Sequence, residues 1–184
     1  MLFSHFSNNK KGETGSRYGG NDSTMAPGDF RIAYFEMDSV AANFELVKEV
    51  KAELNKKENA INSEMDGLAK KLQEKFNYYQ NLAQSGNLSQ EQSDNASQEM
   101  KNMDETMKNR KLQLDQEYND LMTRRQNAIK SEIESFLKEY NKTRNYSYII
   151  SYEQGLFYYK DTAFNITADL VRGLNEKYKN DKKQ

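Results

Sequence analysis

The sequence predicts a mostly helical α+β protein in which a long antiparallel coiled-coil hairpin projects from a small β body. Three observations support this fold class. From residue 29 onward the chain has no proline and only four of its nine glycines, so very long helices can form. Two helical stretches with apolar residues at seven-residue spacing flank the segment LAQSGNLSQEQ, residues 82–92. Short aromatic runs, typical of strands, precede and follow this helical pair.

Composition sets the limits of the fold and of function. The chain has 184 residues, a formal charge of -1 and only 36% hydrophobic residues, which argues for one or two domains without a large central core. It has no cysteine, so disulfides and thiolate metal sites are excluded. The near-zero net charge gives no general attraction for nucleic acid. No apolar run approaches the roughly 18 residues that a membrane-spanning helix needs.

The chain begins with a segment that has no hydrophobic periodicity. Residues 1–29 hold five glycines, the only proline and the only histidine among serine, asparagine and lysine, and are expected to form a disordered tail or linker. RIAYFEMD, residues 31–38, reads as a strand that runs into a helix capped by Asp38 or Ser39. We therefore expect residues 30–40 and 141–179 to form the β-rich body and residues 41–140 to form the helical arm.

The two helices of the arm have matching apolar patterns. If they fold back on each other, facing residues should have numbers with a constant sum. That sum is 175 for all six predicted layers: Val47 with Ala128, Leu54 with Leu121, Ile61 with Leu114, Leu68 with Met107, Leu72 with Met103, and Tyr79 with Ala96. At 1.5 Å per residue, an arm of roughly 40 residues is about 60 Å long.

The turn between the helices is predicted at Gly86 to Ser89. Gly86 can adopt the left-handed conformation that ends a helix, and Ser89 with Gln92 makes a capping box that begins the next. These residues form the hairpin tip. The same alignment puts Lys51, Glu58 and Lys75 at core positions, with Glu58 facing Glu117 and Met65 facing Arg110. This seam indicates either a soft, bendable hairpin or an exposed coiled coil that tolerates polar layers.

The C-terminal part predicts strands and a short helix. NYSYIISYEQGLFYYKD, residues 145–161, reads as a β-hairpin that turns at Glu153, Gln154 and Gly155, and Thr167 can cap a last helix. Three short strands with apolar groups on both faces are not stable alone, so oligomerisation with cyclic symmetry is expected. The apolar groups are Ile32, Tyr34, Phe35, Ile149, Ile150, Leu156, Phe157 and Tyr158.

The sequence contains candidate binding residues but no recognisable catalytic residues. The only histidine, His5, lies in the predicted tail, and no catalytic, cofactor or metal constellation is visible. Aromatic residues and methionines gather near the distal part of the arm and are candidate binding residues for varied partners: Phe76, Tyr78, Tyr79, Met100, Met103 and Met107. The alternative is that the methionines only fill the seam, whereas Tyr78 lies off the seam.

Three segments together resemble the Skp/OmpH family of periplasmic chaperones. They are RIAYFEMDSVAANFELVKEVKAEL, the charged helical pair turned at GNLSQEQ, and NYSYIISYEQGLFYYKDTAFNITADLVRGLNEKY. The resemblance covers roughly residues 30–179, and its most specific parts are the first strand and the terminal segment with NITADLVRGLN.

The resemblance implies a homotrimer in which the strands of three chains form a shared β-barrel and three arms enclose a cavity. It implies an ATP-independent holdase, located in the periplasm, that binds unfolded outer-membrane proteins and prevents their aggregation. The residues that match the body strands are Ile32, Tyr34, Ile149, Ile150, Leu156 and Tyr158, and those that match the tip are Gly86 and Ser89.

The chain departs from the family pattern in two ways. Its near-neutral charge disfavours the lipopolysaccharide binding expected of basic members, and no export signal is visible as the sequence is written. A second hypothesis, from another functional class, is a structural coiled-coil tether that binds one folded partner.

Overall fold

The computed structural model describes residues 30–183. The predicted tail, residues 1–29, lies outside the described residues. The elements follow in the order β1 (Ile32–Glu36), α1 (Met37–Asn43), α2 (Glu45–Gln84), α3 (Gln90–Arg144), β2 (Tyr148–Tyr152), the 3₁₀ turn η1 (Thr162–Phe164) and α4 (Thr167–Asp181). The fold is therefore mostly helical with a small strand region, as predicted.

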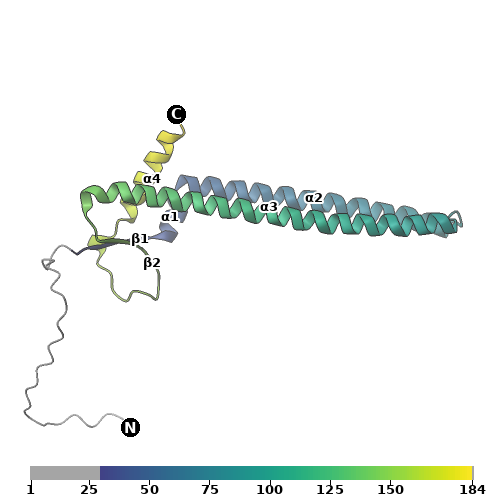
Figure 1. Ribbon diagram of the computed structural model, residues 1–184, viewed down its shortest axis with the longest axis horizontal. Helices are drawn as coiled ribbons and strands as arrows, with labels where there is room; N and C mark the ends of the chain where they lie inside the picture. The colour runs from purple at the N-terminus through teal and green to yellow at the C-terminus, as the bar shows by residue number, and fades with distance from the viewer. Residues whose placement is uncertain (1–29, 184) are drawn as a thin grey trace, which may run out of the picture. The chain divides into compact units, whose positions relative to one another are not determined.

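Helices α2 and α3 form the predicted hairpin, and their connection lies at the end farthest from the strands (Figure 1). Gly86 has φ 70°, the left-handed conformation that favours glycine. The Ser89 hydroxyl accepts from the amide of Gln92 at 3.2 Å, while the Gln92 side chain accepts from the amide of Ser89 at 2.9 Å. The capping box thus begins α3 at the predicted residue.

The seam follows the predicted alignment through the middle of the arm. Ile61 and Leu114, which were predicted to face each other, are both buried. Ion pairs across the two helices join residues whose numbers total 174 or 178, close to the predicted 175: Lys57 with Glu117, Glu64 with Arg110, Lys75 with Glu99, and Glu53 with Arg125. The predicted Glu58–Glu117 contact was wrong, because Glu58 is exposed and Glu117 pairs with its neighbour Lys57.

The predicted layer nearest the strands was also wrong at Ala128. Val47 is buried, but Ala128 is exposed, and Ile129 packs against the core that contains Val47. A strict seven-residue pattern drifts by about 20° per heptad on a straight helix, so after several heptads the adjacent residue faces the partner.

Strands β1 and β2 pair in parallel, with Ile32 beside Tyr148 and Glu36 beside Tyr152. Parallel neighbours need a crossover connection, and here the two arm helices provide it. The other edge of β1 is occupied at Tyr34, whose carbonyl accepts from the amide of Ile166 at 2.9 Å. The candidate residues Ile32, Tyr34, Ile149 and Ile150 all lie in these strands.

The predicted β-hairpin over residues 145–161 was wrong in its second half. Gly155 turns with φ 94°, but Leu156 and Tyr158 lie outside any strand and are 71% and 99% exposed. Aromatic and aliphatic residues favour strands only where a face is covered, and no residue in the range 30–183 covers these two. Instead Lys160 brings the chain back to β1, where its Nζ lies 2.6 Å from Glu36 Oε1.

The core lies where the arm meets the strands. It joins β1, α1, the strand-proximal ends of α2 and α3, and one face of α4, so it extends into the range predicted for the arm. Its largest fully buried side chains are Phe44, Val40, Leu170 and Leu174. Phe44 separates α1 from α2 with an extended backbone, φ -78° and ψ 121°, and its ring packs edge-on against Tyr178.

The predicted caps at Asp38, Ser39 and Thr167 were wrong. Helix α1 begins at Met37, because the Thr167 hydroxyl accepts from the amide of Glu36 at 2.9 Å and leaves Glu36 as the cap. Helix α4 begins at Thr167, and the preceding Asn165 side chain accepts from the Thr167 amide at 2.9 Å. The segment NITADLVRGLN therefore attaches α4 to both the strand and the root of the arm.

Candidate functional site

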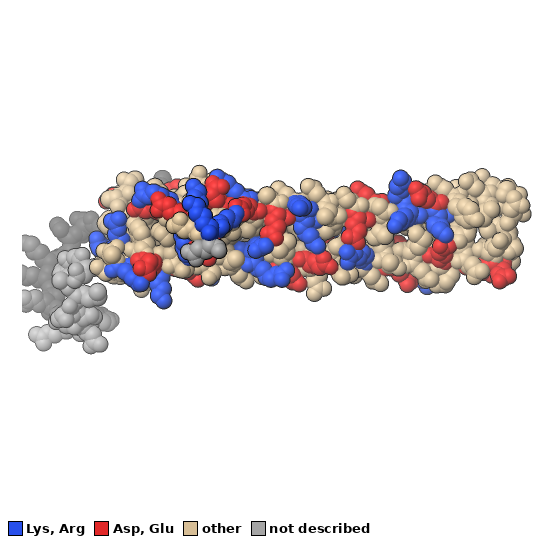
Figure 2. Space-filling model, turned by 90° about the horizontal axis from the view of Figure 1, so that it is seen from above, with Lys and Arg blue, Asp and Glu red and all other residues tan. Residues whose placement is uncertain are grey.

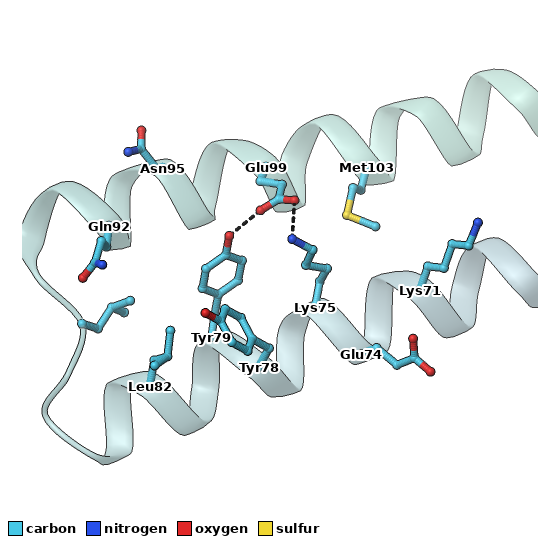
Figure 3. Close-up of a pocket in the computed structure, with 11 residues that line it drawn as sticks. Lys71, Glu74, Lys75, Tyr78, Tyr79, Leu82, Gln92, Asn95, Glu99 and Met103 are labelled. Atoms are coloured by element: carbon cyan, nitrogen blue, oxygen red, sulfur yellow. Dashed lines mark hydrogen bonds and ion pairs between the residues drawn. The ribbon is translucent and has the colours of Figure 1, made fainter.

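The distal part of the arm contains a groove of about 740 Å³ between α2 and α3 (Figure 3). Its apolar lining comes from Tyr78, Tyr79, Leu82, Leu88 and Met103. Four charged side chains line it as well, namely Lys71, Glu74, Lys75 and Glu99, together with Gln92 and Asn95. We call it the Tyr78 groove. Three of the predicted binding residues, Tyr78, Tyr79 and Met103, meet here.

A polar network crosses the Tyr78 groove. The Glu99 carboxylate lies 2.8 Å from Lys75 Nζ and also accepts a hydrogen bond from the Tyr79 hydroxyl (Figure 3). Hydrogen bonds from Lys75 and then Tyr79 lower the pKa of Glu99, and the bond to Glu99 raises the pKa of both partners. Lys75, a polar residue at a predicted core position, is thus accommodated by an anion from the facing helix.

Tyr78 is the exposed aromatic group of this groove. Its side chain is 55% exposed, and its ring meets the Tyr79 ring edge-on, with centroids 5.2 Å apart. The position off the seam that the heptad pattern predicted is therefore correct. An exposed ring in a groove that also contains the half-buried Leu82 and Leu88 can contact a further apolar group at little conformational cost.

Two smaller grooves lie next to the Tyr78 groove. One of about 400 Å³ is lined by Phe76, Tyr79, Gln80, Leu88, Ser93, Ala96, Ser97 and Met100, and we call it the Phe76 groove. The other, of about 410 Å³, contains Leu68, Met103 and Met107. All six predicted binding residues thus line a groove, although not the same one.

The methionines lie at the seam and line the grooves as well. Met100, Met103 and Met107 are half-buried at the seam, and each also lines one of the grooves. Sequence reasoning did not select Leu82 and Leu88 as binding residues. Leu88 lies in the connection between the helices, outside the heptad pattern, and its position between two turn residues was the available signal.

The body has exposed apolar side chains of its own. Ile32, Tyr148, Leu156, Phe157, Tyr158 and Tyr159 all have more than a third of their surface exposed. The Lys160 ammonium lies 3.7 Å from the centre of the Tyr152 ring and 5.2 Å from that of Tyr34, so it holds the loop that carries residues 156–159 against the strands. Cation–π contacts of this kind stabilise by about 0.5–1 kcal/mol at exposed sites.

Within residues 30–183, no helix combines the length and the apolar character needed to cross a bilayer. The same residues contain no group of three or more histidine or acidic side chains suited to hold a metal ion.

Comparison with known proteins identifies the family. No protein of curated function matches the sequence. The crystal structure of a Caulobacter crescentus protein assigned as an OmpH-like outer membrane chaperone superposes with a TM-score of 0.71 at 14% identity, covering 84% of this chain and 89% of the other. At that identity the likeness is one of fold. The family model described as outer membrane protein (OmpH-like) matches residues 31–174. The chain therefore belongs to the OmpH-like family of outer membrane proteins.

Proposed function

We propose that this protein is a chaperone of the bacterial envelope that holds unfolded outer-membrane proteins and prevents their aggregation without ATP. The observation that carries the proposal is the set of three grooves at the distal part of the arm, lined by exposed and half-buried aromatic residues and methionines. Flexible, polarizable methionine and exposed tyrosine suit a surface that accepts many sequences. The structural likeness to a protein assigned as an outer membrane chaperone adds support.

The proposal includes a homotrimer in the periplasm. Tyr158 and Tyr159 are 99% and 86% exposed, beside Leu156 at 71%, which is much apolar surface for one short loop. Packing the strands and loops of three chains together would remove this surface from water and would cover the open edge of β2. Three arms around a common axis would then present their grooves to one enclosed client.

The test is the suppression of aggregation. A urea-denatured outer-membrane β-barrel protein is diluted with and without the protein, in buffer that contains no nucleotide, and turbidity is recorded. We expect turbidity to disappear once one trimer is present per client. Unchanged turbidity at tenfold excess of trimer would refute the proposal.

Two results together would instead identify a structural tether. The protein would bind one folded partner in fixed stoichiometry, and it would not protect unfolded chains from aggregation. The double variant Tyr78→Ser, Phe76→Ser should weaken protection. Leu112→Ser, which removes a 69% exposed apolar side chain of the same arm outside all three grooves, should not.

A further inference from the structure

The end of the arm differs in charge from the rest of it. Residues 76–90 contain no lysine, arginine, aspartate or glutamate, whereas 14 of the 31 residues from 45 to 75 are charged. In Figure 2 acidic and basic side chains alternate over the length of the arm, and its end is mostly free of both. A solvated helix is normally rich in charged pairs, so the composition of this end calls for a reason.

The uncharged segment has a groove on each side. Tyr78 lines the Tyr78 groove and Gln80 lines the Phe76 groove. Tyr78 and Gln80 are two residues apart on α2, so their side chains differ by about 200° around the helix axis. The two grooves therefore lie on opposite flanks of the seam. Tyr79 and Leu88 line both grooves, so one apolar wall separates them.

The charges at the base of the Tyr78 groove balance one another. Lys71 and Lys75 are matched in number by Glu74 and Glu99, and Lys75 is paired directly with Glu99 at 2.8 Å. A charged ligand at Lys75 or Glu99 would have to compete with that existing pair. Glu74 lies 3.9 Å from Lys70, which leaves Lys71 as the single lining cation without an ion pair among the described residues. The groove therefore favours an uncharged ligand over an anion or a cation.

The same segment supplies free hydrogen-bonding groups. Gln80, Asn81, Gln84 and Asn95 make no side-chain hydrogen bond with any residue in the described range. Each carboxamide both donates and accepts, as a peptide group does. Tyrosine combined with asparagine, glutamine and serine is also the composition that antibody loops use for adaptable binding.

We infer that the arm end, residues 76–98, which contains no cation and only Glu91 and Asp94 as anions, is a docking surface for extended, uncharged segments of an unfolded polypeptide that carry aromatic side chains. The two grooves receive the aromatic side chains, and the carboxamides bind the peptide groups of the segment. The inference rests on the proposed function, since it specifies which part of a client the arm end recognises. It also predicts that this recognition does not depend on salt.

The geometry favours a peptide over a glycan or an anionic lipid surface. Sugars stack on open aromatic faces, but Lys75 lies over the Tyr79 ring at 5.8 Å and the Tyr78 ring meets it edge-on, so in the Tyr78 groove stacking is limited to Tyr78. An anionic bilayer requires a cluster of cations, and residues 76–98 contain none.

The experiment measures binding of a fluorescent ten-residue peptide, of alternating phenylalanine and serine with blocked termini, to the full-length protein by anisotropy. We expect the dissociation constant to change less than threefold between 50 and 500 mM NaCl. Tyr78→Ser should raise it by about fivefold or more, as loss of an aromatic contact does. Gln80→Lys should weaken binding of a lysine-containing version of the peptide more than it weakens binding of the uncharged peptide. The exposed-residue control Leu112→Ser should bind normally.

Three outcomes would overturn the inference. They are a tenfold or greater loss of affinity with salt, equal binding by Tyr78→Ser and Leu112→Ser, and tighter binding of a chitin tetrasaccharide or of phosphatidylglycerol vesicles than of the peptide. The turbidity assay is run on the same samples. Full protection without peptide binding would reject the docking surface and keep the chaperone, whereas peptide binding without protection would reject the chaperone and keep the surface.

Discussion

The side chain of Asn175 on α4 accepts a hydrogen bond from the backbone amide of Glu45 at 2.9 Å and donates one to the carbonyl of Asn43 at 3.0 Å. These two backbone groups flank Phe44, where the helix is interrupted. One carboxamide thus replaces backbone bonds that the interruption removes, and it joins α4 to the root of the arm.

Replacing this carboxamide should loosen the arm root. Asn175→Ala leaves a backbone donor and a backbone acceptor without their partner, which should cost about 1–2 kcal/mol in the free energy of unfolding. Hydrogen exchange at the Glu45 amide should accelerate while exchange at the middle of α2 is unchanged. Asn180→Ala, also on α4, is the control. Equal exchange at Glu45 in both variants would contradict the role assigned to Asn175.

Glycine is needed at position 173 because of the adjacent Phe136 ring, not because of an unusual backbone conformation. A Cβ at this position would lie 2.2 Å from the ring of Phe136. Gly173→Ala should therefore destabilise the protein by about 1–3 kcal/mol, although alanine is the better helix former. In a Phe136→Leu background, Gly173→Ala should no longer destabilise the protein, or should stabilise it. A double-mutant cycle in urea measures the coupling, and independent effects would show that the two residues do not limit each other.

Leu114 should be the costliest seam residue to truncate. It is 2% exposed and faces the buried Ile61, so Leu114→Ala should lower the free energy of unfolding by about 2–3 kcal/mol. Leu68→Ala, at a half-buried position, should cost less. The matched control Leu112→Ala removes the same group from a 69% exposed position and should change stability by less than about 0.5 kcal/mol. Thermal and urea unfolding, followed by circular dichroism, provide the comparison.

Acid should weaken the arm by protonating its cross-helix carboxylates. The pKa values of Glu64, Glu99 and Glu117 are lowered from 4.5, mainly by hydrogen bonds from Arg110, Lys75 and Lys57. Because the pKa is lower in the folded state, the stabilisation is present above pH 4.5 and is lost as the pH falls below it. Glu99→Gln should lower Tm at pH 7, and its difference from the unaltered chain should shrink by pH 3. The exposed residue control Glu58→Gln should show neither effect.

An acidic residue in β2 should prevent assembly. Ile150 lies beside Tyr34 in the parallel pair, and the proposed trimer places this region between chains. Ile150→Asp should reduce the sedimentation mass from that of a trimer to that of one chain, because a buried, unpaired carboxylate is strongly unfavourable. Leu112→Asp makes the same kind of change on the exposed arm and should leave the mass unchanged. A trimer of Ile150→Asp would refute the shared body.

The arm was predictable because periodicity is a local signal that repeats. Seven-residue spacing at Ile61 and Leu114, with a glycine and a capping box between the helices, determines which residues meet. The body was less predictable, because its contacts join distant segments. Parallel pairing of β1 with β2 cannot be deduced from either strand alone. The aromatic residues around Tyr158 predicted a strand that the described residues of one chain leave uncovered.

The candidate site, too, was predictable in part. Tyr78, Tyr79 and Met103 were selected by residue type and heptad position, and they do meet in one groove. The partner of Lys75 was not predictable from the pattern, since Glu99 reaches it through side-chain geometry rather than by an assigned facing position. The Phe44 interruption was missed as well, because its cause is a carboxamide more than a hundred residues away.

The parallel pairing of β1 and β2 has a consequence for the order of folding. Arg31 and Ser147, which hydrogen-bond at the start of the sheet, are 116 residues apart in the chain, and closing so long a loop directly is slow. The hairpin needs only local contacts, beginning beside Gly86, and its completion brings the end of α3 back to the start of α2. We therefore expect the arm to form first and to bring the two distant strands together, so a chain that ends before β2 should have an arm and no body.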